Sequence, residues 1–158
     1  MSENRHLAQF NIGRFRYRTE DPRMADFMNN LDLVNGLAER SKGFVWRLTN
    51  FRPFNDDPNM AVNLTVWESV EDLERFVWQT VHKRFYGRRP EWFDAMDTPH
   101  FVMWWVPAGH PPTLAEAKER LEHLTANGPS DYAFGWESVP VARLWKTARC
   151  GVMDGQAA

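Results

Sequence analysis

Two hydrophobic periodicities alternate along this chain, and their order is the feature that most constrains its fold. Apolar and polar residues alternate over residues 6–12, 44–50 and 60–67, a pattern typical of β-strands. Residues 100–106 are apolar on both faces, as in a strand that is covered on both sides. Apolar residues at helical spacing follow the first and the third of these strands. The order β-α-β-β-α-β predicts an α+β fold of the ferredoxin-like, split-βαβ type, with two helices on one face of an antiparallel sheet.

Local signals place the ends of the predicted helices. Asp21 before Pro22 starts the first helix, which should run for about 17 residues. Gly43 is expected to end this helix. Ser69 caps the second helix, and Pro90 is expected to break or kink it.

A further helix is predicted after the fourth strand. Thr113 and Glu116 form a capping box at its start, and Gly128 ends it. A short final strand is possible within YAFGWES, and the residues that follow show little pattern. We therefore predict one domain over residues 1–140, with this helix appended to the fold, and a loosely ordered C-terminal tail over residues 141–158.

Composition excludes several classes of protein. The net charge of −2 argues against nucleic acid as a partner. Cys150 is the only cysteine, so no internal disulfide can form, and no apolar run reaches the length of a membrane span. We expect a cytoplasmic protein that does not enter the membrane. The five histidines lack the spacings of a classical metal site, so no metal is predicted.

One face of the predicted sheet is strongly apolar across several strands. It carries Phe10, Phe44, Trp46, Leu48, Val62 and Leu64. The two main helices cover the opposite face, and few other elements remain to shield this one. A second copy of the chain is the simplest cover, so we predict a homodimer in which two sheets close into a barrel.

The opposite face is polar or amphipathic, although the helices should cover it. Strand parity places on it Gln9, Asn11, Arg47, Asn63, Thr65 and Trp67. Polar groups under helices must bond to each other, to water or to a ligand. The functional interpretation is a ligand pocket between sheet and helices. The structural alternative is that strand bending moves several of these residues to the sheet edge.

Trp78, His82 and Tyr86 lie four residues apart and form one stripe on the second helix. If this stripe faces a pocket, His82 is suited to accept a proton from a phenol or an enol. The alternative is a histidine that bonds to a backbone carbonyl, and a metal or haem ligand is less favoured. Arg47 is either a clamp for a carboxylate or an oxyanion, or a partner of Glu68 or of a helix acid.

Two further groups have a functional and a structural interpretation. Lys83, Arg84, Arg88 and Arg89 form a basic run that either binds an anionic group or is simply solvated. Trp104 and Trp105 project to opposite faces of the fourth strand, so one should enter the core of the dimer while the other lines the pocket. Packing rather than chemistry is the favoured role for the pair.

Several separated motifs resemble the domain of unknown function 3291 family. They occur in order over residues 6–139 and comprise HLAQFNIGR, DPRMADF, LAERSKGFVWRL, NLTVWESVEDLERFV, RRPEWF, PHFVMWWVPAGHPPT and RLEHL with the NGP and YAF segments after it. The segment TVWES and the helix after it also resemble the dimeric α/β-barrel superfamily, which includes antibiotic-biosynthesis and haem-degrading monooxygenases.

The superfamily resemblance implies two chemistries. Cofactor-independent members bind an easily oxidised aromatic molecule between sheet and helices. Haem-degrading members use a first-strand asparagine, a tryptophan at the end of the third strand and a helix histidine. Trp67 matches that tryptophan, and Asn11 or Gln9 matches the asparagine. The axial histidine of those enzymes would fall near Phe85 or Tyr86, whereas His82 stands where many non-haem members carry a histidine.

We therefore predict a small-molecule-binding protein, of the cofactor-independent monooxygenase type, that acts on an aromatic or polycyclic substrate. Its catalytic residues are expected to be His82, Arg47, Asn11, Asn63 and Tyr86. Its substrate-binding residues are expected to be Gln9, Thr65, Trp67, Trp78 and Trp105. The alternatives are a haem-binding or haem-degrading protein of the same superfamily and a non-catalytic ligand-binding module.

Overall fold

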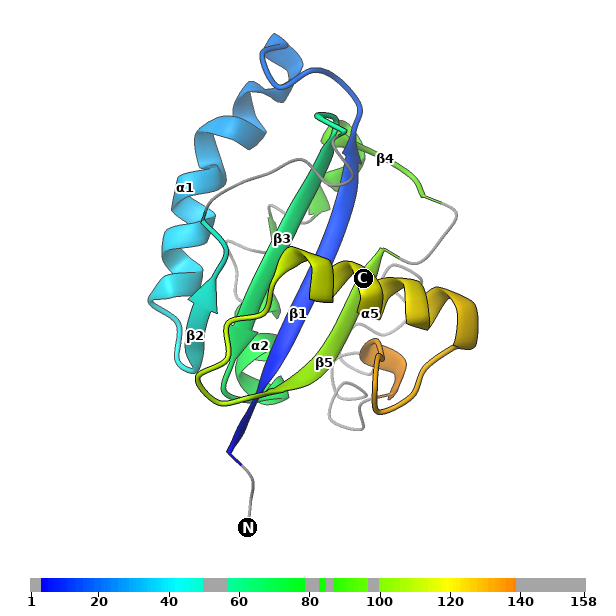
Figure 1. The fold of residues 1–158 in the computed structure, drawn as a ribbon. Coiled ribbons are helices and arrows are strands. Elements are labelled where there is room, and N and C mark those ends of the chain that lie inside the picture. The colour runs from blue at the N-terminus through cyan, green and yellow to red at the C-terminus, as the bar shows by residue number, and fades with distance from the viewer. Residues whose placement is uncertain (1–3, 50–56, 79–82, 85–86, 97–99, 139–158) are drawn as a thin grey trace.

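The fold is built on an antiparallel sheet whose central strand is β1 (Arg5–Phe15), as shown in Figure 1. The computed structural model describes residues 4–49, 57–78, 83–84, 87–96 and 100–138. On one side β1 pairs with β3 (Met60–Trp67), which in turn pairs with β2 (Phe44–Arg47). On the other side it pairs with β5 (Phe101–Pro107) and with the short β4 (Phe93–Asp94). The order β2-β3-β1-β5 is that of the ferredoxin-like fold, as predicted.

The register between β1 and β3 confirms the two predicted faces of these strands. Gln9 lies opposite Thr65 and Asn11 lies opposite Asn63, so their side chains share one face. The other face carries apolar side chains in the core of the protein: Ala8, Phe10, Ile12, Met60, Leu64 and Val66. The sheet therefore separates a polar face from an apolar face along its two central strands.

The parity predicted for the second strand is wrong at its start. A register shift lies between Phe44, which is opposite Trp67, and Trp46, which is opposite Val66. Phe44 therefore packs on the ring of Trp67 on the polar face, whereas Trp46 packs on the apolar face. Arg47 lies opposite Thr65 and remains on the polar face, as predicted. An inserted residue in a strand this short reverses the alternation locally.

The helices α1 (Ala25–Glu39) and α2 (Val70–Trp78) pack on the polar face of the sheet. Asp21 does cap the first helical turn, because its carboxylate accepts from the backbone N–H of Arg23 at 2.8 Å. Ser69 likewise caps α2, since its hydroxyl accepts from the backbone N–H of Asp72 at 3.1 Å. Both predicted helix starts are confirmed.

Gly43 does not end α1, as the sequence suggested, because the helix stops at Glu39. Gly43 has φ 86°, and its carbonyl accepts from the backbone N–H of Glu68 at 2.7 Å. A Cβ at this position would collide with the carboxylate of Asp72. The glycine is therefore required where the first residues of β2 and α2 meet, and not as a helix cap.

The helix break predicted at Pro90 is present, because Arg88 forms a turn and a new helix, α4 (Arg89–Trp92), begins after it. Pro90 lies in the first turn of α4, where a proline is tolerated because its missing N–H has no helical partner. Pro90 therefore helps to begin a new helix rather than to kink an existing one. The helical restart expected at residues 91–96 is replaced after Trp92 by β4, which pairs with the end of β1.

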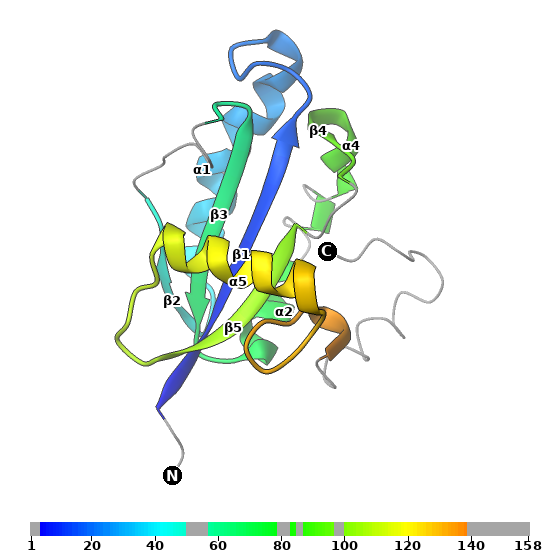
Figure 2. The same cartoon turned by 45° about the vertical axis from the view of Figure 1, so that its right-hand side comes forward.

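The appended helix α5 (Leu114–Asn127) lies across the apolar face of the sheet, opposite α1 and α2 (Figures 1 and 2). Its residues Ala117 and Leu121 enter the same core as Phe10, which is 0% exposed in the single chain. Much of the face that was expected to need a second copy is thus covered by the chain's own helix. The sequence-based reason for a dimer is accordingly removed for this part of the sheet.

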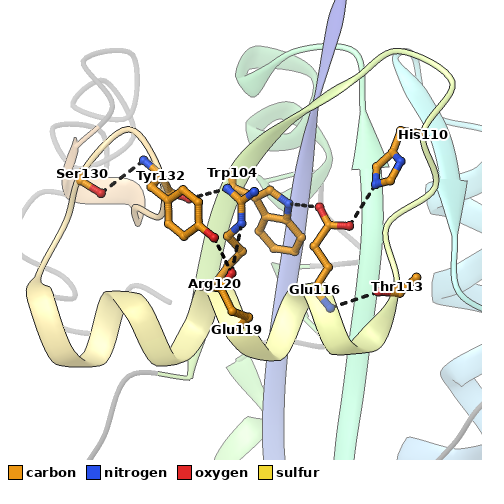
Figure 3. A network of polar contacts seen from close by, with 8 residues as sticks. All are labelled: Trp104, His110, Thr113, Glu116, Glu119, Arg120, Ser130 and Tyr132. Atoms are coloured by element: carbon orange, nitrogen blue, oxygen red, sulfur yellow. Dashed lines mark hydrogen bonds and ion pairs between the residues drawn. The ribbon is translucent and has the colours of Figure 1, made fainter.

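Polar contacts hold α5 in place, as Figure 3 shows. The carboxylate of Glu116 accepts from the indole N–H of Trp104 on β5 at 2.9 Å and lies 2.9 Å from the ring Nε2 of His110. Thr113 caps the helix at its start, as predicted, and Gly128 follows its last residue with φ 79°. Farther along α5, the guanidinium of Arg120 donates to the carbonyl of Tyr132 at 2.9 Å. These contacts tie the helix to β5 and to the segment that follows the helix.

Residues 130–138 form no regular strand, although the sequence allowed a short one within YAFGWES. Phe134 makes an isolated bridge to Met103 on β5, and a 3-10 turn over Trp136–Ser138 follows it. Trp136 is buried against the helices on the polar face of the sheet. The predicted C-terminal tail lies outside the described residues, and its looseness stays a prediction.

We expect the contact of α5 with the sheet to weaken in acid. Partial burial raises the pKa of Glu116, but the hydrogen bonds from His110 and Trp104 outweigh burial and hold it below the ordinary 4.5. A lowered pKa in the folded state gives stability that is present above pH 4.5 and is lost as the pH falls below it. In urea unfolding, Glu116→Gln should cost about 1 kcal/mol at neutral pH and progressively less in acid. A difference between the two proteins that did not change with pH would contradict this.

Candidate functional site

A cavity of about 770 Å³ lies between the polar face of the sheet and the helices α1 and α2. Its size is within the range of sites that enclose a drug-sized molecule. Six of the predicted polar-face residues line it: Gln9, Asn11, Arg47, Asn63, Thr65 and Trp67. The structure therefore favours the pocket interpretation over the alternative in which strand bending moves these residues to the sheet edge.

The floor of the cavity is a hydrogen-bonded row of side chains, which we call the amide ladder: Gln9, Asn11, Asn63, Thr65 and Trp67. The indole N–H of Trp67 donates to the hydroxyl of Thr65 at 2.9 Å, and this hydroxyl donates to Gln9 Oε1 at 2.9 Å. Gln9 Nε2 donates to Asn11 Oδ1 at 2.6 Å. Asn63 Nδ2 donates to the same two oxygens, at 3.2 Å to Gln9 and 3.1 Å to Asn11. The ladder ties β1 to β3 through side chains as well as through the backbone.

Trp67 gives the amide ladder a direction. An indole N–H can only donate, so Thr65 accepts from it and has its own O–H left to donate to Gln9. The oxygens of Gln9 and Asn11 each accept two hydrogen bonds within the ladder, which is the number an amide oxygen can hold. They have no further capacity to accept from a ligand.

Two polar groups of the amide ladder take no part in its hydrogen bonds and can bind a ligand. The Nδ2 of Asn11 donates to no residue within the described parts of the chain, and the Oδ1 of Asn63 accepts from none of them. Both residues line the cavity. The ladder thus presents a donor from β1 beside an acceptor from β3. A donor of this kind stabilises a carbonyl oxygen or an oxyanion, and the acceptor receives a hydroxyl proton.

Aromatic rings form the walls of the cavity. At one end the Trp67 ring is 1% exposed and lies between Phe44, edge to face at 5.5 Å, and Phe76, stacked at 5.4 Å. At the other end Phe93 stacks on Phe15 at 5.3 Å and meets Phe27 edge to face at 5.4 Å. Except for Phe44, these rings line the cavity. Such walls favour a flat, apolar ligand and exclude water.

The Phe93 end of the cavity was missed by the sequence analysis. Gly13 on β1 carries the available signal, because an isolated glycine within a strand often marks a close approach of another group. A Cβ at Gly13 would lie 2.7 Å from the Phe93 ring, so only a glycine lets this ring lie against the strand. Trp92 is also buried in this aromatic group and lines the cavity.

Arg47 is held by an acid of a helix, which was the structural alternative for this residue. Its Nε donates to the carboxylate of Glu39 on α1 at 2.6 Å, while its side chain still lines the cavity. The pairing orients the guanidinium and neutralises part of its charge. Arg47 therefore offers a ligand its remaining N–H groups rather than an unpaired charge.

Of the tryptophans predicted to bind substrate, Trp78 lines the cavity but Trp105 does not. Trp78 lines the cavity at the end of α2, with Lys83 Nζ 5.4 Å from the centre of its ring. Trp105 lies outside the cavity lining, with Arg5 above its ring at 4.4 Å and Phe134 beside it at 6.3 Å. Trp104 is on the apolar face, as one of this pair was expected to be.

His82 and Tyr86 lie outside the described residues, as do Val81 and Phe85 of the predicted helical stripe. His82 as the base and Tyr86 as its neighbour stay predictions. Within its described span, α2 carries no histidine, cysteine, methionine or tyrosine that could serve as an axial ligand of haem. Across the described parts of the chain, no three metal-ligating side chains gather at one place.

The structure is an α+β protein of the ferredoxin-like type, with a cavity between its sheet and two of its helices. Among solved structures, a candidate antibiotic biosynthesis monooxygenase from Nitrosomonas europaea is similar, with TM-score 0.51 and 9% identity over 72% of this chain and 98% of that one. A conserved protein from Methanosarcina mazei Go1 has TM-score 0.51 and 10% identity over 66% and 93%. The cofactor-independent oxygenase SnoaB from Streptomyces nogalater has TM-score 0.47 and 15% identity over 66% and 94%.

The family model for the domain of unknown function DUF3291 matches residues 6–150, and this chain belongs to that family. A search of the curated proteins finds no match. The solved structures are covered almost completely by about two thirds of this chain, so the chain carries additional residues beyond the shared fold. At their low identity these structures establish the fold alone.

We predict that Thr65→Val destabilises the protein by about 1–3 kcal/mol although it preserves the side-chain shape. Thr65 is 6% exposed, and without its hydroxyl the buried Trp67 N–H has no acceptor. Urea unfolding measures the loss. Thr125→Val is the matched control, since that hydroxyl donates to the helical carbonyl of Leu121. Equal effects of the two substitutions would show that the amide ladder contributes no special stability.

Proposed function

We propose that this protein binds a small aromatic molecule between sheet and helices and stabilises its deprotonated oxygen for reaction with dioxygen. The observation that carries the proposal is the available Asn11 amide N–H beside the Asn63 oxygen, at the floor of an aromatic cavity. A donor in such surroundings stabilises a phenolate or an enolate more strongly than it would in water. An electron-rich anion of this kind supplies the four electrons that reduce dioxygen, as when a phenol becomes a quinone. One oxygen atom forms the new C=O bond, and the other leaves as water with the two hydrogens lost from the phenol.

The proposed roles follow the positions of the side chains. Asn11 and Arg47 donate to the deprotonated oxygen of the substrate, and Asn63 Oδ1 accepts from its hydroxyl before deprotonation. Gln9 and Thr65 fix the orientation of the two asparagines. Trp67 and Trp78 form walls of the cavity. Trp105, whose ring packs on Phe134 outside the cavity lining, is given no role in binding the substrate. His82 is the proposed base and Tyr86 its neighbour, on the sequence evidence alone.

Asn11→Asp tests the proposal because it keeps the oxygen that accepts within the amide ladder and replaces the N–H donor that faces the cavity with an oxygen. The new carboxylate can still accept from Gln9 and Asn63, but the N–H donors become a negative oxygen facing the cavity. We expect 4-nitrophenol bound to the unmodified protein to ionise about one pKa unit below its value in water, and above that value in Asn11→Asp. Absorbance of the nitrophenolate measures the shift.

Asn127→Asp is the matched control, because it makes the same change on α5, on the other face of the sheet. Its bound 4-nitrophenol should titrate as in the unmodified protein. Oxygen-electrode assays with phenols and quinols then test catalysis, and Asn11→Asp should abolish any uptake. An unshifted pKa for the bound phenol in the unmodified protein would contradict the proposal.

The two alternatives give different results in the same assays. A non-catalytic ligand-binding module binds the phenol and leaves oxygen unconsumed. A haem protein gives a shifted Soret band on titration with haem, and His82→Ala or Tyr86→Phe would remove it. Absence of a spectral shift with excess haem would eliminate that alternative.

The homodimer stays a prediction, and α5 leaves less of the apolar face for a partner chain to cover. Trp46, Leu48 and Val62 are among the residues that are only partly buried on the apolar face, so a partner could still cover them there. Light scattering at micromolar concentration should give twice the 18.5 kDa of one chain if the copies pair. A mass of one chain would exclude the dimer.

The cytoplasmic location also stays a prediction, and none of the described helices is long and apolar enough to cross a membrane.

A further inference from the structure

The segment that follows α5 passes from one face of the sheet to the other. Ala133 is 0% exposed and packs in the apolar core together with α5. The next residue, Phe134, packs in the cluster on the polar face, and so does Trp136. At this crossing the segment lies against the edge of β5, because the backbones of Phe134 and Met103 exchange hydrogen bonds of 2.8 Å and 3.0 Å. Residues 130–138 therefore connect the two sides of the sheet around this edge (Figures 1 and 2).

The crossing brings Trp136 into the lining of the cavity. Its side chain is 7% exposed and lines the cavity together with that of Phe101 on β5. The two rings stack, with 5.7 Å between their centres and 25° between their planes. The aromatic walls at the two ends of the cavity contain no residue of β5. Phe101 and Trp136 therefore form a third wall, which we call the β5 wall.

The register of β5 on β1 places the β5 wall next to the polar floor of the cavity. Phe101 lies directly opposite Asn11, and Met103 lies opposite Gln9. Facing residues of antiparallel strands have their side chains on the same face, with Cβ atoms about 4.5–5.5 Å apart. The Phe101 ring therefore stands beside the Asn11 amide, with the Trp136 ring stacked on it. An aromatic ligand whose oxygen bonds to Asn11 Nδ2 would lie within reach of this wall.

We infer that Trp136 is a substrate-binding residue and that the segment after α5 is part of the binding site. The inference rests on the part of the proposed function that places a small aromatic molecule in this cavity, and it adds a contact to that function. The ferredoxin-like order of elements is complete at β5, so a chain with that order alone would lack this ring. The addition thus has two roles: α5 covers the apolar face, and the segment after it completes the cavity on the polar face.

Substitutions at Trp136 test the contact through the affinity for 2-naphthol, measured by isothermal titration calorimetry. Trp136→Leu should weaken binding about fivefold, since it removes an aromatic stacking surface, and Trp136→Phe should recover most of the affinity because it keeps a ring. Tyr132→Leu is the matched control from the same segment. The Tyr132 ring lies outside the cavity lining and packs on His123 and Arg120 of α5, so its loss should change the affinity by less than about twofold.

A second measurement separates direct contact from a purely structural role of Trp136. In protein labelled with 5-fluorotryptophan, Trp136→Phe and Trp46→Phe identify the fluorine resonances of these two residues. The ring of bound 2-naphthol changes the magnetic field at nearby nuclei, so the Trp136 resonance should shift during the titration. The Trp46 resonance should stay in place, because that ring packs on the apolar face of the sheet.

The possible failures are distinguishable. A Trp136 resonance that stays in place while 2-naphthol binds, or an unchanged affinity in Trp136→Leu, would overturn the inference and leave the proposed function standing. Equal losses in Trp136→Leu and Tyr132→Leu would show that the segment is only a structural support, which would also overturn it. Absence of any binding of 2-naphthol would remove both.

The remaining outcomes also decide. If circular dichroism shows that Trp136→Leu does not fold, the fluorine titration of the labelled protein with its full set of tryptophans gives the answer. If Trp136 contacts the naphthol while bound 4-nitrophenol keeps the pKa that it has in water, the binding residue is supported and the proposed chemistry fails.

Discussion

The pairing of β1 with β3 is the constraint on which the rest of the structure depends. It extends from Leu7 opposite Trp67 to Arg14 opposite Met60, and both strands lie at the centre of the sheet. Because side chains alternate between faces, a shift of one residue would move Asn11 and Asn63 under α5 and Phe10 under α1. The register therefore places the amide ladder in the cavity and the apolar core under α5 at the same time. Trp67, Thr65 and Gln9 reinforce it with side-chain bonds that only this register permits.

The sequence predicted an element correctly where that element had a long periodic segment or a strong helix cap. The alternation over Met60–Trp67 predicted the bounds of β3 and both of its faces, since eight alternating residues leave little choice of orientation. Thr113 and Gly128 marked the ends of α5 because their preferences are local to the backbone. The polar residues of the cavity floor followed from the same parity.

Other features depend on contacts that a single sequence does not display. The irregularity between Phe44 and Trp46 has no periodic signature within a four-residue strand. Gly43 resembled a helix cap, although its requirement comes from the carboxylate of Asp72, distant in sequence. The spacing of α5 predicted a helix but not the surface it covers, and so a second copy was invoked for that role. The aromatic group around Phe93 assembles from three separate segments and was likewise not apparent.

The attachment of α5 has a consequence for how the fold is maintained in a cell. Six residues, 108–113, join the end of β5 to the start of this helix. A cover tethered by so short a connection is held at a high effective concentration next to the surface it protects. Its docking is a unimolecular event, independent of how many copies of the protein are present. A chain built in this way keeps this apolar face of the sheet covered from the moment α5 emerges, even when it is synthesised in small amounts.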